Sequence, residues 1–178
     1  MQDQMMLKGW TKEITRATCR PEAQTVHCIA RLDQPVGAVI PYLNAVLGGY
    51  TYCREPQSVT FRSQGKLISV HDDHIAINAL QDAEEAERIL QWLQREINDA
   101  WAKRDEITPS FQAAPRPQVM AILRLLPKSN CGKCGQPTCI VFASLAMEGG
   151  KGEGDCPELT PDQATRLREY LGQFRFDW

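Results

Sequence analysis

The chain has 178 residues, 43% of them hydrophobic and 24% charged, with a formal net charge of −2. These values are typical of a soluble globular protein with room for one ordinary domain and a small second one. The absence of a basic run argues against nucleic-acid binding. The N-terminus lacks the pattern of a signal peptide, and the apolar runs are too short to span a bilayer. We therefore expect a cytoplasmic protein without a membrane span.

The first half of the chain predicts a small antiparallel or mixed sheet. Residues 24–33 are rich in β-branched and apolar side chains, which indicates a strand. Residues 38–47 have partial helical spacing and end at Gly48-Gly49, with Pro41 in the first turn, where its missing N–H is harmless. Alternation of apolar and polar residues then predicts three further short strands, at about 57–63, 66–71 and 74–78.

The strongest helical pattern follows at residues 82–107. Asp82 and Glu85 resemble a capping box at its start, where acidic residues suit the positive end of the helix dipole. An apolar stripe at three- and four-residue steps is expected to cover one face of the sheet. The stripe consists of Ala86, Ile89, Leu90, Leu93, Ile97, Ala100 and Trp101.

Three prolines, Pro109, Pro115 and Pro117, predict a linker at 108–117 because proline disfavours both helix and strand. The expected organisation is an α+β domain at 10–107, whose suggested role is docking, and a small mainly helical domain at 118–178. In the second domain, helices are predicted at about 118–126, from Cys139 onward, and after Thr160-Pro161. The helix that begins at Cys139 is expected to have one apolar face, formed by Ile140, Phe142, Ala143, Ala146 and Met147. The fold class is therefore α+β.

The chain contains seven cysteines, and four of them are clustered in the second half. An odd number without an export signal makes a disulfide framework a poor explanation. The cluster has the spacing Cys131-x2-Cys134-x4-Cys139-x16-Cys156. A redox disulfide, a zinc site and an iron–sulfur cluster are the three candidate explanations.

An iron–sulfur cluster fits the residues best. A thioredoxin-like CxxC follows a strand in a βαβ unit, and this one follows a short helix. Structural zinc sites favour two close ligand pairs, and only the pair Cys131 and Cys134 is present. A [4Fe–4S] cube needs four thiolates, and glycines let backbone N–H groups approach its sulfides. Cys139 at a predicted helix start would also place its thiolate at the positive end of the dipole.

The residues between the cysteines carry a family resemblance. The stretch NCGKCGQPTCIVFASLAMEGGKGEGDCPEL is similar to the four-cysteine domain of the corrinoid iron–sulfur protein large subunit and of the Rnf complex B subunit, over about residues 118–160. The resemblance implies one [4Fe–4S] cluster on Cys131, Cys134, Cys139 and Cys156. It also implies that seven further residues surround the cluster ligands: Gly132, Lys133, Gly135, Pro137, Thr138, Phe142 and Pro157.

The function expected from these observations is one-electron transfer to or from a protein partner, without substrate chemistry of the chain's own. The chain has no room for the corrinoid barrel of one relative and lacks the membrane anchor and ferredoxin motifs of the other. An accessory or assembly subunit of a larger metalloenzyme, in corrinoid or one-carbon metabolism, is the alternative, with a structural or regulatory cluster. A zinc-stabilised interaction module is the third hypothesis. No catalytic motif is present.

Several other residues have simpler explanations. The segment His71 to His74 (HDDH) is expected to form a hairpin turn rather than a metal or acid–base cluster. Cys28 is expected to pack as a small hydrophobic residue, and Cys19 and Cys53 show no ligand pattern. Two sets of residues have no decided role. They are Lys128, Lys133 and Lys151 beside the cysteines, and Phe174, Phe176 and Trp178 in the C-terminal tail.

Overall fold

The computed structural model describes residues 5–16, 24–63 and 65–174. It divides into two compact units, residues 1–114 and residues 115–177. Cys19, Phe176 and Trp178 lie outside the described residues, so the structure does not bear on what the sequence suggests for them. Each unit is described by itself.

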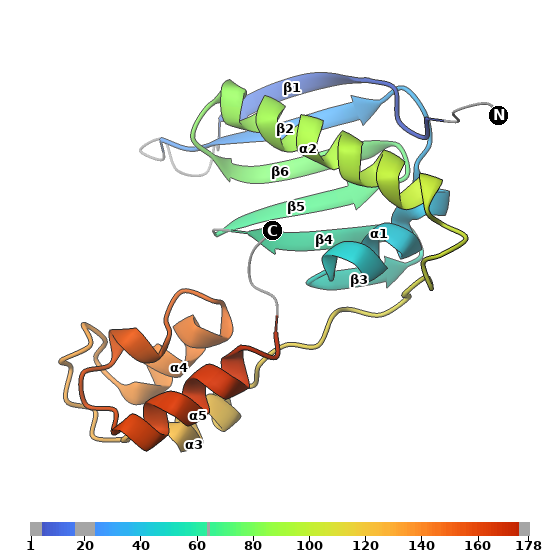
Figure 1. Ribbon diagram of the computed structural model, residues 1–178. Coiled ribbons are helices and arrows are strands. Elements are labelled where there is room, and N and C mark those ends of the chain that lie inside the picture. The colour runs from blue at the N-terminus through green and yellow to red at the C-terminus, as the bar shows by residue number, and fades with distance from the viewer. Residues whose placement is uncertain (1–4, 17–23, 64, 175–178) are drawn as a thin grey trace. The chain divides into compact units, whose positions relative to one another are not determined.

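The N-terminal unit contains a six-stranded sheet in which each pair of neighbours is antiparallel (Figure 1). The spatial order is β1-β2-β6-β5-β4-β3. The predicted α+β class is confirmed, and the sheet is antiparallel rather than mixed. The strands are β1 (Trp10–Arg16), β2 (Val26–Leu32), β3 (Thr51–Arg54), β4 (Gln57–Ser63), β5 (Lys66–His71) and β6 (His74–Leu80).

Four of these strands match the sequence prediction, and the two edge strands were not predicted. β1 has the sequence WTKEITR, in which most residues are exposed and only Trp10 and Ile14 contact the core. β3 has four residues and only Tyr52 packs inward. An edge strand has a neighbouring strand along one edge only, so the core covers fewer of its side chains and fewer of them are apolar. The alternation of apolar and polar residues that indicates a strand is therefore weak here.

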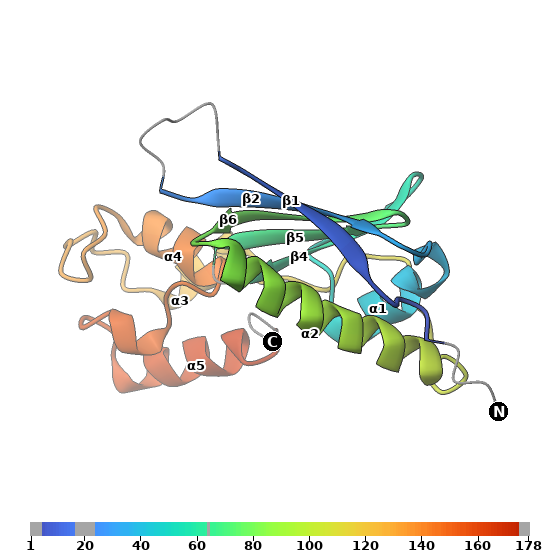
Figure 2. The same ribbon diagram turned by 90° about the horizontal axis from the view of Figure 1, so that it is seen from above.

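Two helices cover one face of the sheet: α1 (Ile40–Leu47), which follows a single 3₁₀ turn at Gly37–Val39, and α2 (Ala83–Ala102) (Figure 2). Pro41 lies in the first turn of α1 as predicted, and Gly48 ends the helix at φ 72°. The predicted stripe of α2 is confirmed, with five of its members buried against the sheet. These are Ala86, Leu90, Leu93, Ile97 and Ala100.

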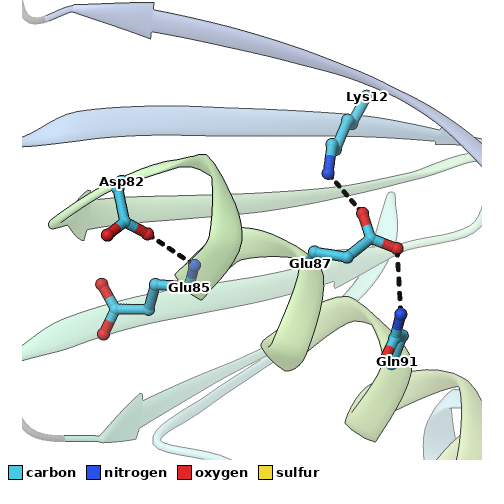
Figure 3. A network of polar contacts seen from close by, with 5 residues as sticks. All are labelled: Lys12, Asp82, Glu85, Glu87 and Gln91. Carbon is cyan, nitrogen blue, oxygen red and sulfur yellow. Dashed lines mark hydrogen bonds and ion pairs between the residues drawn. The ribbon is translucent and has the colours of Figure 1, made fainter.

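Polar contacts fix the start of α2 (Figure 3). The Asp82 carboxylate accepts a hydrogen bond from the Glu85 N–H at 2.7 Å, which confirms the predicted cap. The Glu85 carboxylate reaches back to the Gln81 N–H at 2.7 Å, one residue earlier than in a standard capping box. One turn later Glu87 pairs with Lys12 of β1 and accepts from Gln91, so the helix is anchored to the edge strand.

One buried amide helps to hold a strap formed by residues 107–114, together with backbone hydrogen bonds from Ser110 to Pro41 and from Ala114 to Gly49. Asn44 is 2% exposed, and its side-chain nitrogen donates to the carbonyls of Ser110 and Gln112 at 2.9 and 2.8 Å. Its side-chain oxygen accepts from the Gly49 N–H at 2.9 Å. The same residue therefore closes α1 and fixes the end of the N-terminal unit.

We expect Asn44→Ala to lower the free energy of unfolding by about 2–3 kcal/mol, because it removes three hydrogen bonds made by a buried side chain and leaves the buried Gly49 N–H without its acceptor. Urea unfolding followed by far-UV circular dichroism measures the change. Ala45→Ser, on the exposed side of the same helix, is the control and should change stability by less than about 0.5 kcal/mol. Equal stability of Asn44→Ala and the parent chain would contradict this assignment.

The C-terminal unit packs α3 (Val119–Leu125), α4 (Cys139–Met147) and α5 (Pro161–Leu171) around a small core. The capping box predicted at Thr160 and Gln163 is present. One prediction was wrong, because Ile140 is 47% exposed rather than on the buried face of α4. It lies about 200° around the helix from the buried Phe142. None of the helices in the described ranges is long and apolar enough to cross a bilayer.

Candidate metal centre

The first three cysteines of the cluster lie in one loop that leads into α4. Gly132 and Gly135 have φ values of 70° and 79°, which other residues rarely adopt, and the Gly135 N–H donates to the Gly132 carbonyl at 3.0 Å. The turn runs from Gly132 to Gly135, so Cys131 directly precedes it and Cys134 lies within it. A Cβ atom at Gly135 would meet no atom within 4 Å, so the loop borders open space.

Asn130 joins the beginning of this loop to its end. It has a positive φ of 49°, and its side-chain oxygen accepts a hydrogen bond from the Cys139 N–H at 2.8 Å. Thr138 is the N-cap of α4 and accepts from the Val141 N–H at 3.4 Å. Together the two side chains cap the first turn, so Cys139 is held at the first helical position as predicted. The capping of α4 by Asn130 was not predicted from the sequence. The signal that could have indicated a structural role is the residue type, because asparagine tolerates a left-handed conformation better than most residues.

The fourth cysteine comes from a separate loop that two ion pairs hold. Lys133 Nζ lies 2.6 Å from Glu158 Oε1, which links the first loop to the segment just after Cys156. Arg168 of α5 lies 2.6 Å from Glu153, three residues before Cys156. The glycine-rich segment is thereby fixed on both sides of the cysteine that it carries.

The four thiols differ in burial and in electrostatic surroundings. Cys134, Cys139 and Cys156 pack against the core of the C-terminal unit that contains Phe142, while Cys131 is exposed. Burial raises the pKa of Cys156, and repulsion from the other three thiols adds to the shift. The backbone N–H of Lys133 and the Ser129 hydroxyl hold the pKa of Cys131 below its ordinary value. The charges of the other three thiols therefore act on Cys156.

The donor set fits an iron–sulfur cluster. Six cysteines are described, and all are free thiols, so these four are available as thiolate ligands. A [4Fe–4S] cube binds each of its four thiolates through a different iron, next to a backbone that can donate to the sulfides. Across the described ranges, no three histidine, cysteine or acidic side chains are gathered as they would be around a single metal ion.

The other predicted residues near the cysteines have separate roles. Phe142 is buried in the core of the unit, and Pro137 and Pro157 are exposed in the two loops. Lys133 is paired with Glu158, and Lys151 lies 3.6 Å from Asp155. In the N-terminal unit, Cys28 is 1% exposed in the core, as expected, and Cys53 is exposed in β3.

The segment His71 to His74 is a hairpin turn, which confirms that prediction. Asp72 and Asp73 connect β5 to β6, and an Asp72 carboxylate oxygen accepts from the Gly37 N–H at 2.6 Å. The His71 and His74 rings are stacked, with centroids 4.2 Å apart. Burial, followed by the charge of His74, lowers the pKa of His71.

This shift predicts a pH-dependent stability. The folded state binds the His71 proton more weakly than the unfolded state, so the free energy of unfolding should fall as the pH drops through about 6.5. His71→Gln should reduce that slope between about pH 7.5 and 5. Urea midpoints at several pH values measure it, and the parent chain is the reference. The same slope in both proteins would contradict the expectation.

The fold and the thiol arrangement define an α+β protein with a small cysteine-bearing helical unit, and comparison with known proteins assigns the class of that unit. Residues 126–158 match the family model described as "Putative Fe-S cluster". This part of the chain is therefore similar to an iron–sulfur cluster domain. No solved structure matches the chain significantly.

Curated relatives are similar over the same part of the chain. The acetyl-CoA decarbonylase/synthase complex subunit gamma of Methanothermobacter thermautotrophicus is 42% identical over 52 residues, which are 29% of this chain and 11% of that protein. The corrinoid/iron-sulfur protein large subunit of Moorella thermoacetica is 45% identical over 41 residues, 23% of this chain and 9% of that protein. The matching stretch thus spans about a tenth of each relative. The predicted resemblance to the corrinoid protein is confirmed.

Proposed function

We propose that the chain carries one [4Fe–4S] cluster, bound by Cys131, Cys134, Cys139 and Cys156. The observation that supports this most strongly is that Cys134, Cys139 and Cys156, which come from two separate loops, lie against one small core in the part of the chain that matches an iron–sulfur family. Asn130 and the Lys133–Glu158 pair would position those loops around the cluster. The cluster supplies a one-electron redox couple when bound.

The function that we infer from this is electron transfer to or from a protein partner. Cys131 is exposed, so one side of the ligand set is open to an approaching redox protein. The domains would be 10–107, a linker at 108–117 and 118–178, and the N-terminal α+β domain would serve as the docking module. A reducing compartment such as the cytoplasm suits free thiols and the cluster.

A second function is favoured by the names of the relatives. They are named as subunits, so the alternative is an accessory or assembly subunit of a larger metalloenzyme in one-carbon or corrinoid metabolism, with a structural or regulatory cluster. The two functions differ in whether the cluster cycles between oxidation states in the intact protein.

Reversible reduction distinguishes them. Anaerobically purified protein is titrated with a low-potential reductant and then reoxidised, with visible absorbance and electron paramagnetic resonance recorded at each step. Electron transfer predicts the appearance of one unpaired spin per cluster and full recovery of the oxidised spectrum over several cycles. Loss of the cluster on the first reduction would reject electron transfer and favour the structural role.

A further inference from the structure

The helix-covered face of the N-terminal sheet contains a cavity that the cluster does not involve. α2 crosses this face, while α1 lies toward one end of β3 and β4 (Figures 1 and 2). Between the first half of α2 and the β4–β5 hairpin, a cavity of about 270 Å³ remains. Its lining includes Ser63, Lys66, Glu85, Arg88, Ile89 and Trp92.

The cavity contains a nearly buried ion pair whose lysine has unused hydrogen-bond donors. Lys66 Nζ lies 3.0 Å from Glu85 Oε1, and the two side chains are 12% and 16% exposed. The other oxygen of Glu85 already accepts from the Gln81 N–H, so its acceptor capacity is largely used. The ammonium of Lys66 has three donors, and within the described part of the chain Glu85 is its one acceptor. An acceptor that enters the cavity would complete this group.

The remaining lining gives the cavity a charge and an apolar side. Arg88 is exposed at the edge and has no ion-pair or hydrogen-bond partner among the described residues. The two cations Lys66 and Arg88 and the one carboxylate Glu85 give the cavity lining a net charge of one positive unit. Ile89 and Trp92 supply apolar surface beside it, and the Ser63 hydroxyl can donate or accept.

We propose that this cavity binds a small organic monoanion with an apolar body, such as a single-ring or short-chain carboxylic acid. The carboxylate would lie between Lys66 and Arg88, and the body would pack on Ile89 and Trp92. Few convergent polar groups in a partly apolar cavity are the usual pattern of a small-molecule site. The volume, close to the lower end of such sites, restricts the ligand to one ring or a short chain.

The test uses benzoate and its uncharged analogue benzamide on the cluster-loaded full chain, with binding measured by saturation-transfer NMR. Benzoate should bind saturably below about 10 mM, the range expected for so small a ligand, and benzamide at least fivefold more weakly. Arg88→Gln should weaken benzoate binding at least fivefold. Arg95→Gln, seven residues later on α2 and outside the cavity lining, is the matched control and should leave it unchanged.

Three results would overturn the proposal. They are no saturable benzoate binding up to about 10 mM, equal binding of benzamide, and equal binding by Arg88→Gln. The proposal is independent of the cluster, because none of its residues belongs to the C-terminal unit. A negative result therefore leaves the proposed electron transfer unaffected, and a failed redox cycle leaves this site unaffected.

Discussion

Cys156→Ser is expected to abolish the four-iron cluster. In the proposed site this cysteine is the ligand from the second loop, and the ion pairs Lys133–Glu158 and Glu153–Arg168 hold that loop in place without it. The variant should therefore fold and yet retain fewer than four irons per chain. The fraction of chains with an intact cube should fall more than about tenfold, because an iron that loses its thiolate ligand is easily released. Iron and acid-labile sulfide analysis of anaerobic protein measures this.

The chain offers a matched control for this substitution. Cys53→Ser replaces an exposed cysteine of β3, in the N-terminal unit, and should retain the iron and sulfide content of the parent. Full four-iron occupancy in Cys156→Ser would remove this residue from the ligand set. Equal losses in both variants would mean that the effect is general oxidation or instability rather than ligation.

The second large effect concerns the Lys133–Glu158 pair beside the ligands. Each charge alone would act on the reduction potential, and the two largely cancel while they are paired at 2.6 Å. Lys133→Gln leaves a negative charge and should lower the potential of the cluster. Glu158→Gln leaves a positive charge and should raise it. The expected shifts are on the order of tens of millivolts at low salt and smaller at high salt.

Redox titration of both variants at two ionic strengths tests this pair. The opposite signs distinguish an electrostatic effect from a loss of the link between the loops, which would alter cluster retention in the same direction in both variants. Arg166→Gln is the control, because Arg166 pairs with Asp162 on α5 and does not link the ligand loops. Shifts of equal sign, or none at low salt, would contradict the electrostatic account.

Local patterns explain which parts of the fold were predictable. The α2 stripe and its Asp82 cap, the α5 capping box and the three strands from Gln57 to Leu80 are set by residues within a few positions of one another. The edge strands β1 and β3 were missed because few of their residues face the core. The exposure of Ile140 was missed because α4 is apolar on both sides.

The candidate metal centre divides in the same way. The four candidate cysteines are predicted from their spacing, and the helix start at Cys139 and the positive φ values of Gly132 and Gly135 agree with the residue types found there. The contacts that hold the loops together could not, because they join residues far apart in the sequence. Lys133 and Glu158 are 25 positions apart, and Arg168 reaches Glu153 across 15 positions. Such pairs depend on the folded unit as a whole.

Native mass spectrometry of the anaerobically purified chain tests the central claim most directly. A [4Fe–4S] cluster predicts one bound species, heavier than the apoprotein by four irons and four sulfides, which is absent from Cys156→Ser and retained in Cys53→Ser. A species heavier by a single zinc ion, without sulfide, would contradict the account and assign the four cysteines to a mononuclear site instead.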